Sequence, residues 1–253
     1  MPTETSVVAD GRATRVLRDG NGPPLVWLHD SPGNTWTEAH TRLSASHSVL
    51  APSLPGFEDS TTLSGIDSPE DVVFWLLDVL SELDLSSAAV VGCGLGGWMA
   101  AEFAIRYPSL VSRLVLVDAY GLYVPGALPE DEFALTAPML RPLVFASAST
   151  PDLEPPERVE ATLHARVAAA RLAWQFPYDR KLRGRLQRAS MPALVVWGEQ
   201  DGLVPLDHAH AYVEALPNAS LEIIKAAAHY PYAENPEAFT RAVEQFLAQP
   251  KPT

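Results

Sequence analysis

The chain has 253 residues, of which 47% are hydrophobic and 19% charged, as in an ordinary soluble globular protein of one large domain or two small ones. Its formal net charge of −13 argues against nucleic-acid binding, because neutralising phosphates requires a surface rich in lysine and arginine. The single cysteine excludes an internal disulfide, and no apolar run reaches the roughly 18 residues that suggest a membrane span. We therefore expect a cytoplasmic monomer or homodimer that binds a small-molecule substrate and neither nucleic acid nor a membrane.

Short apolar runs alternate with segments of helical periodicity from Leu25 to the end of the chain. This alternation predicts an α/β protein with a mostly parallel, doubly wound central sheet and helices on both faces. The predicted strands cover residues 25–28, 49–51, 88–91, 114–117, 194–197 and 221–224. The predicted helices cover about 36–44, 69–83, 95–107, 205–215 and 236–248.

The region 119–190 breaks this rhythm, because many prolines separate its helical pieces, one of which is expected at about 156–174. An insertion of this length in a compact α/β domain is usually a lid over a site. We predict an α/β core made of residues 1–118 and 191–253, with residues 119–190 inserted as a helical cap.

The stretch VVGCGLGG fits two different glycine motifs. Gly92, Gly94 and Gly97 match the dinucleotide fingerprint G-x-G-x-x-G, and Asp118 supplies an acid at the end of the next predicted strand. With Gly96 as the third glycine, the same stretch matches the nucleophile elbow G-x-S-x-G, except that glycine replaces the serine. The dinucleotide fingerprint normally follows the first strand of its domain, whereas two predicted strand-and-helix units precede this one.

Four further stretches resemble the α/β-hydrolase family, in that family's order, over nearly the whole chain from Leu25 to Leu247. LHDSPG resembles the oxyanion loop H-G-x-P-G, with Asp30 in place of the usual glycine, and APSLPGFEDS resembles the turn D-L-P-G-F-G-x-S. WGEQDGLVP resembles the stretch that presents the catalytic acid, and AHYPYAENPEAF resembles the stretch that carries the catalytic histidine. Together these motifs favour a hydrolase of the α/β type over a dinucleotide-binding protein.

The resemblance implies a catalytic pair formed by His229 and Asp201. It places Gly94 where the family carries its nucleophilic serine, and glycine has no side chain that could attack a carbonyl. The backbone N–H groups of Leu95 and Ser31 would form an oxyanion hole, which stabilises developing negative charge.

Several other residues enter the predicted site. Asp118 is the alternative catalytic acid, since some hydrolases carry the carboxylate after that earlier strand. Cys93 precedes the elbow position, but successive side chains of an elbow point in different directions, so it is a weak candidate for a replacement nucleophile. No cluster has the spacing of zinc ligands, and we expect neither a metal nor a cofactor. The predicted substrate contacts are Asp30, Trp36, Tyr120 and Trp174.

Three functions remain open from the sequence. The first is an enzyme that acts on a small carbonyl compound, by cleaving an ester, a lactone or a C–C or C–O bond, or as a lyase or cyclase. In it, the His229–Asp201 pair would act as general base beside the oxyanion hole, with water or a substrate group in the space left free at Gly94. The second is an ordinary serine hydrolase that carries a Ser-to-Gly substitution at position 94. The third is a non-catalytic ligand-binding protein on the same scaffold.

Overall fold

The computed structural model describes residues 1–9, 11–57, 65–151, 153, 159–173 and 177–250. Its centre is an eight-stranded sheet with the strand order β1-β2-β4-β3-β5-β6-β9-β10. The pairs β1/β2 and β2/β4 are antiparallel, and every other neighbouring pair is parallel, which confirms the predicted mostly parallel sheet. The strands are β1 (Thr3–Ala9), β2 (Arg12–Asp19), β3 (Pro24–Leu28), β4 (Ser48–Pro52), β5 (Ala88–Cys93), β6 (Val111–Val117), β9 (Ala193–Gly198) and β10 (Ala219–Ile224).

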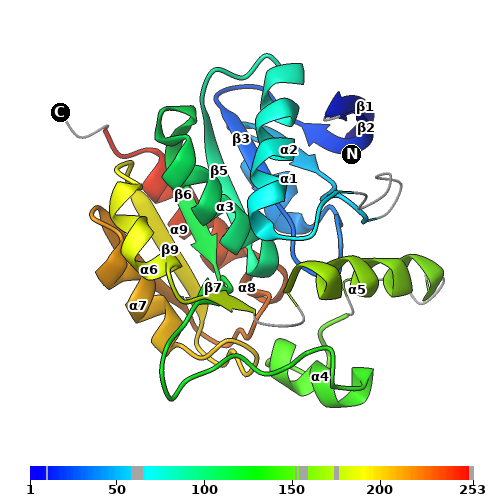
Figure 1. The fold of residues 1–253 in the computed structure, drawn as a ribbon, viewed down its shortest axis with the longest axis vertical. Helices are drawn as coiled ribbons and strands as arrows, with labels where there is room; N and C mark the ends of the chain where they lie inside the picture. The colour runs from blue at the N-terminus through cyan, green and yellow to red at the C-terminus, as the bar shows by residue number, and fades with distance from the viewer. Residues whose placement is uncertain (10, 58–64, 152, 154–158, 174–176, 251–253) are drawn as a thin grey trace.

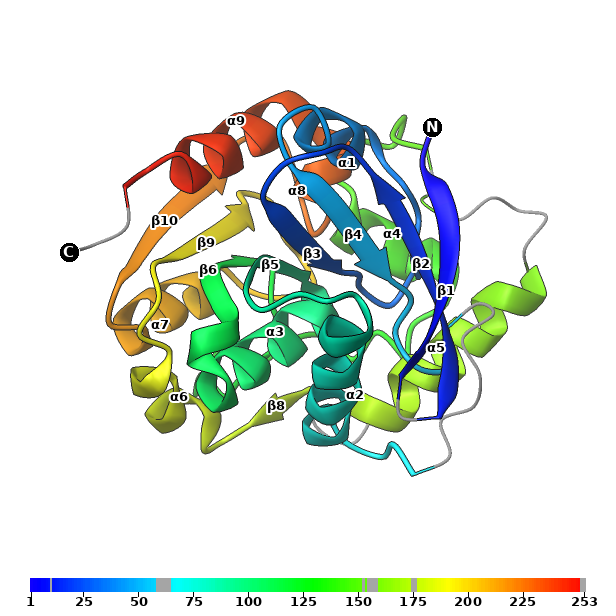
Figure 2. The same cartoon turned by 90° about the horizontal axis from the view of Figure 1, so that it is seen from above.

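Helices cover both faces of the sheet, as the doubly wound pattern predicts (Figure 1). Figure 2 shows α1, α8 and α9 on one side of the sheet and α2, α3, α6 and α7 on the other. None of the helices in the described part of the chain combines the length and the apolar composition that crossing a bilayer requires. These helices are α1 (Glu38–Leu43), α2 (Pro69–Glu82), α3 (Gly94–Arg106), α6 (Leu182–Arg185), α7 (Asp207–Ala215), α8 (Pro231–Glu234) and α9 (Pro236–Leu247).

The N-terminal hairpin of β1 and β2 was not predicted. Residues of β1 are mostly exposed or half-buried, so this strand lacks the apolar run that marks the other strands. The local signal for it is the dipeptide Asp10-Gly11 between two segments of similar length, with Gly11 at a φ of +70°. Periodicity alone misses an edge strand of this kind, because only one of its faces packs on the protein.

The segment 119–190 contributes no strand to the main sheet among its described residues. It carries a parallel pair of two-residue strands, β7 (Gly121–Leu122) and β8 (Tyr178–Asp179), and the helices α4 (Ala137–Val144) and α5 (Val159–Ala173). Figure 1 shows α4 and α5 together at one end of the molecule. The helix predicted at about 156–174 corresponds to α5, and its first and last predicted residues lie outside the described ranges.

The register of the central strands brings two loops together. Leu28, the last residue of β3, pairs with Gly92 of the parallel strand β5. The chain continues from these two partners in the same direction, so Asp30 and Gly94 leave the sheet side by side. Ligands of open α/β sheets bind at this edge, outside the carboxyl ends of the strands.

Candidate active site

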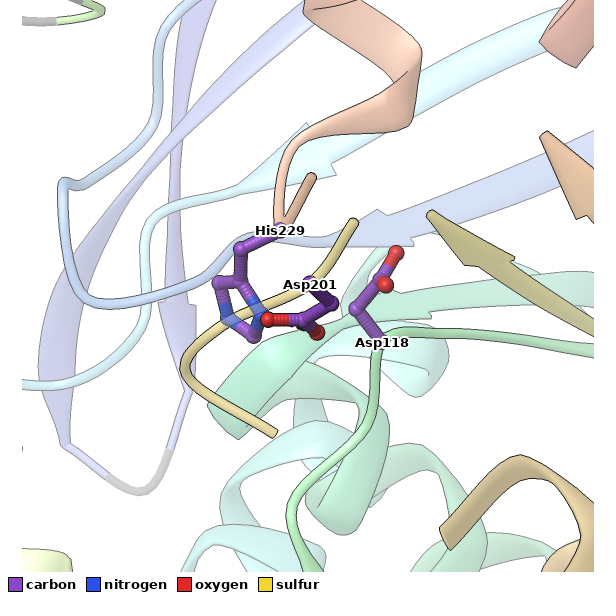
Figure 3. Close-up of side chains that lie close together, drawn as sticks. All are labelled: Asp118, Asp201 and His229. Atoms are coloured by element: carbon purple, nitrogen blue, oxygen red, sulfur yellow. Dashed lines mark hydrogen bonds and ion pairs between the residues drawn. The ribbon is translucent and has the colours of Figure 1, made fainter. Parts of the chain in front are cut away.

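A buried histidine and a buried aspartate face each other at the carboxyl edge of the sheet. Nδ1 of His229, in the loop after β10, lies 2.8 Å from Oδ2 of Asp201, in the loop after β9. Both side chains are completely shielded from solvent. Figure 3 shows the imidazole directed toward the Asp201 carboxylate. The structure therefore brings together the two residues that the sequence predicts as a catalytic pair.

The surroundings of His229 favour its protonated form. Burial opposes a charged imidazolium, but the carboxylates of Asp201 and Asp30 outweigh this effect and raise the pKa of His229 well above its ordinary value. An imidazole fixed by a carboxylate at Nδ1 presents Nε2 to whatever lies on its other side.

Asp118 lies on the far side of Asp201 from the imidazole (Figure 3). The backbone of Asp118 has a φ of +45°, and Oδ1 of its side chain accepts a 2.9 Å hydrogen bond from the backbone N–H of Gly198. Burial, reinforced by the neighbouring Asp201 carboxylate, raises the pKa of Asp118 well above its ordinary value. Of the two candidate acids, Asp201 is therefore the one bonded to His229, and Asp118 is bonded to the Gly198 amide.

The space above Gly94 is occupied by the side chain of Asp30. Gly94 opens α3 with a φ of +49°, and a Cβ atom placed on it would lie 2.1 Å from Cγ of Asp30 and 2.2 Å from both carboxylate oxygens. The expectation that glycine leaves room there for water or a substrate group is therefore wrong for this structure. A carboxylate from the neighbouring loop fills the position where an elbow side chain would stand.

Asp30 joins the His229–Asp201 pair. Its Oδ2 lies 3.1 Å from Nε2 of His229, and its Oδ1 accepts a 2.8 Å hydrogen bond from the backbone N–H of Leu95. Only 1% of Asp30 is exposed to solvent. The side chains form a continuous chain in the order Asp30, His229, Asp201, which we call the Asp30–His229–Asp201 triad.

Two sequence-based expectations change with this arrangement. The Leu95 amide, predicted as an oxyanion-hole donor, is bonded to Asp30 and not directed at an open space. The same carboxylate also lies at the start of α3, where a dinucleotide site would hold a pyrophosphate. Asp30, predicted as a substrate contact, is thus a member of the buried cluster.

The backbone of Asp30 is held by His29. Nδ1 of His29 lies 2.8 Å from the carbonyl oxygen of Asp30, and Nε2 accepts a 2.9 Å hydrogen bond from the backbone N–H of Leu54. Burial lowers the pKa of His29 to about 4, so the imidazole is neutral and donates from Nδ1. The neutral ring ties the Asp30 loop to the turn after β4, which fixes where the carboxylate points.

These contacts weaken the hypothesis of a serine hydrolase with a single Ser-to-Gly substitution. A serine at position 94 and an aspartate at position 30 would compete for the same space, as the collision of the added Cβ atom shows. Glycine at 94 and aspartate at 30 are complementary, because one removes a side chain where the other inserts one.

A cavity of about 190 Å³ lies next to the triad, on the side of the 119–190 segment, and none of the three triad residues is in its described lining. It adjoins the triad through Leu95, whose N–H is bonded to Asp30, and through Tyr120, whose ring lies beside that of His229. Its wall includes Leu95, Tyr120 and Glu132. The Glu132 carboxylate accepts hydrogen bonds from Ser31 Oγ (3.0 Å) and from the Tyr120 hydroxyl (3.3 Å). Desolvation, reinforced by the Asp30 carboxylate, raises the pKa of Glu132 to about 7. Glu132 was not among the predicted site residues, because it lies in the proline-rich region far from any motif.

The other residues predicted to contact a substrate or to react lie in different parts of the structure. Tyr120 lines the cavity, and its ring centroid lies 5.7 Å from that of His229. Trp36 packs on the ring of His40 and lines neither described cavity, so its position gives no support for substrate binding. Trp174 lies outside the described residues. Cys93 is buried, and burial raises the pKa of its thiol well above the ordinary value, which disfavours a reactive thiolate.

Two clusters in the described part of the chain have metal-ligand atoms within reach of one another. In the first, Asp118, Asp201 and His229, the imidazole nitrogen is already bonded to Asp201. The second, Glu70, Glu102 and Asp179, forms ion pairs with the guanidinium groups of Arg106 and Arg185. In both clusters a cationic group of the protein compensates the carboxylates.

Comparison with known proteins gives one consistent result. Residues 25–242 match the sequence model of a family described as "Alpha/beta hydrolase family". The chain is 29% identical to the 2-hydroxymuconate semialdehyde hydrolase of Pseudomonas putida, over 96% of this chain and 93% of the relative. It is also 29% identical to the 2-hydroxy-6-oxononadienedioate/2-hydroxy-6-oxononatrienedioate hydrolase of Burkholderia vietnamiensis, over 96% and 94% of the two chains. The solved 2-hydroxy-6-oxo-6-phenylhexa-2,4-dienoate hydrolase of Rhodococcus sp. strain RHA1 shares the fold, with a TM-score of 0.81, 19% identity and coverage of 98% and 99%.

Proposed function

This chain belongs to the α/β-hydrolase family, and on that basis we propose that it hydrolyses a small organic molecule without a serine nucleophile. The observation that supports the proposal is the Asp30–His229–Asp201 triad beneath the glycine elbow. A histidine held between two carboxylates is an oriented base, and a positioned base contributes about 10²- to 10⁴-fold to a rate.

In this proposal the neutral form of His229 takes a proton from water, and Asp201 holds the imidazole in the correct tautomer and stabilises the imidazolium that forms. Because the neighbouring carboxylates favour the protonated form, His229 must first release its proton, for which the neutralisation of Asp30 would provide the occasion. The backbone N–H groups of Leu203 and Val204 donate to Oδ1 of Asp201 and keep this carboxylate in place. The 119–190 segment acts as a lid, because its residues form most of the cavity wall over Leu95.

The relatives support hydrolysis as the reaction class. Two of them are named as hydrolases of 2-hydroxymuconate semialdehyde and of 2-hydroxy-6-oxononadienedioate. We propose the same reaction class, hydrolysis, for this chain but not the same substrate. The reason is that this chain has glycine at position 94, where a serine nucleophile would stand, and Asp30 in the space above it. A carbonyl substrate of the kind expected from the sequence needs a donor for its oxyanion, and Asp30 would have to release the Leu95 amide first.

A non-catalytic binding protein is the competing function. A pure binder has no use for an imidazole fixed between two carboxylates, and such a buried charged cluster is costly to maintain. The proposal is tested with a panel of small esters, lactones and epoxides, with turnover measured for the wild-type chain and for His229→Ala. His210→Ala is the matched control, because His210 is an exposed histidine on α7.

We expect turnover of at least one class of compound, lost about 10²-fold or more in His229→Ala and kept in His210→Ala. We also expect no inhibition by phenylmethylsulfonyl fluoride, which sulfonylates activated serines. Inhibition by this reagent, or turnover unchanged in His229→Ala, would contradict the proposal.

A further inference from the structure

The carboxylate of Asp30 is held like a reacting group. One oxygen is fixed by the Leu95 amide at 2.8 Å, and the other lies 3.1 Å from Nε2 of His229. Its backbone is fixed through His29. We infer that Asp30 is the nucleophile of this enzyme and that its substrate carries a saturated carbon bonded to oxygen in a strained ring, as in an epoxide. This inference rests on the proposed hydrolytic function and names its substrate class.

The position of Asp30 favours a saturated carbon over a carbonyl carbon. A carboxylate that attacks a carbonyl forms an anhydride and needs a donor for the oxyanion, and the Leu95 amide is already bonded to Oδ1. Attack by Oδ2 on a saturated carbon forms an ordinary ester and leaves Oδ1 on the Leu95 amide. The bond between the ring carbon and the ring oxygen breaks, and its electron pair stays on the oxygen.

Glu132 is placed to protonate that oxygen. Its carboxyl contacts Ser31, the next residue after Asp30, and Tyr120, whose ring packs near His229, and it forms part of the cavity wall. A pKa of about 7 keeps a large fraction of this carboxyl protonated near neutral pH. The proton moves from Glu132 to the ring oxygen as the ring opens, so the product is a hydroxyalkyl ester of Asp30, and Glu132 becomes a carboxylate.

The His229–Asp201 pair completes the cycle. Ester formation removes the charge of Asp30, so the protonated His229 passes its proton through solvent to the Glu132 carboxylate. The neutral His229 then takes a proton from water, the water oxygen adds to Cγ of Asp30, and the resulting oxyanion on Oδ1 faces the Leu95 amide. The bond from Cγ to Oδ2 breaks, the departing alcohol takes the proton from His229, and the acid proton left on Asp30 passes to His229, which restores the starting state. The sum is substrate plus water giving a diol, and one water oxygen stays in the Asp30 carboxylate.

The cavity wall limits the charge and size of the substrate. Its described lining includes Glu130, Asp131 and Glu132 and no lysine, arginine or histidine. An anionic substrate would be repelled, so we expect an uncharged one. The volume of about 190 Å³ is slightly larger than a cavity of about 150 Å³ that binds benzene. A one-ring epoxide such as styrene oxide is therefore a suitable probe.

The test is covalent capture of styrene oxide. Wild-type chain, His229→Gln and Asp30→Asn are incubated with it and analysed by intact mass and peptide mapping. His229→Gln blocks the water attack, so we expect a stable adduct of one styrene oxide on the peptide that contains Asp30. Asp30→Asn is expected to form none. Glu132→Gln is expected to slow ester formation about 10²-fold and to remove the decline in its rate as pH rises through about 7. Asp30, His229 and Tyr120 also face Glu132, and their titration could change the rate. The pH profile of the wild-type chain is therefore measured alongside, and only the decline that Glu132→Gln removes is assigned to Glu132.

A second measurement does not depend on the folding of a variant. A single turnover of wild-type chain in water labelled with heavy oxygen is expected to place the label in Asp30 and not in the diol. Label in the diol alone, an adduct on another carboxylate, or no consumption of styrene oxide would overturn the inference. Ester or lactone turnover that depends on His229 without any Asp30 adduct would leave the proposed function standing and refute only the nucleophile assignment.

Discussion

Serine at position 94 is the substitution that probes the Asp30 site most sharply. The added Cβ atom would lie 2.1 Å from Cγ of Asp30, so the Asp30 side chain must leave its place. Asp30 then loses its hydrogen bonds to the Leu95 amide and to His229. Serine must also adopt the positive φ of +49° that glycine tolerates.

The expected loss of stability follows from these contacts. A positive φ costs a non-glycine residue about 1–2 kcal/mol, and each lost hydrogen bond to a charged group costs about 1.5–3 kcal/mol. We therefore expect Gly94→Ser to lower the free energy of unfolding by about 4–8 kcal/mol, out of the roughly 5–15 kcal/mol typical of a native protein. The double variant Asp30→Gly with Gly94→Ser removes the collision and is expected to recover a large part of this loss.

Urea denaturation of the wild-type chain, the two single variants and the double variant gives the coupling energy between positions 30 and 94. Gly126→Ser is the matched control, because Gly126 also has a positive φ, of +85°, and nothing lies within 4 Å of an added Cβ atom. Gly126→Ser should lose only the unfolding free energy that corresponds to backbone strain, about 1–2 kcal/mol. Equal losses for Gly94→Ser and Gly126→Ser would refute the idea that Asp30 fills the elbow position.

Three further predictions concern the other buried groups. The pKa of Glu132 rises from 4.5 to about 7 on folding, so its contribution to stability is complete below pH 4.5 and is lost as pH rises to about 7. Glu132→Gln should remove this pH dependence of the unfolding free energy and Glu130→Gln should keep it, and equal profiles would contradict the assignment. Asp118→Asn should lower the unfolding free energy by less than about 1 kcal/mol, because the amide oxygen can still accept from Gly198. Asp118→Ala should lower it by about 1–3 kcal/mol, because it leaves the Gly198 amide unsatisfied, and equal losses in the two variants would argue against this bond. Cys93 should react with a thiol reagent such as dithionitrobenzoate only when the chain is unfolded, and fast reaction in the native state would disprove its burial as an inert thiol.

The sequence predicts most of the fold and two members of the triad. Buried parallel strands appear as continuous apolar runs, so β3 and its neighbours were found within a few residues of their observed bounds. Asp201 and His229 follow recognisable strands, and the carboxyl ends of parallel strands meet at one edge of the sheet. The edge strand β1 (Thr3–Ala9) was not predicted, because only one of its faces is buried.

The role of Asp30 required knowledge of strand register. Its motif position and that of Gly94 were each noted as a departure from the family pattern, but separately. The pairing of Leu28 with Gly92 makes the two departures neighbours, and the side chain gained at one position fits the space lost at the other. Glu132 had no local signal, since it reaches the site only through the path of the 119–190 segment.

The contact between Asp30 and His229 is the feature on which the triad most directly depends. An NMR pH titration of the His229 imidazole in the wild-type chain and in Asp30→Asn measures it, with Asp131→Asn as a control for an exposed carboxylate near the same cavity. The wild-type imidazole should stay protonated well above pH 6.5, and its pKa should fall in Asp30→Asn, because a neutral amide replaces a carboxylate 3.1 Å from Nε2. A pKa of His229 that is the same in all three proteins would contradict the triad.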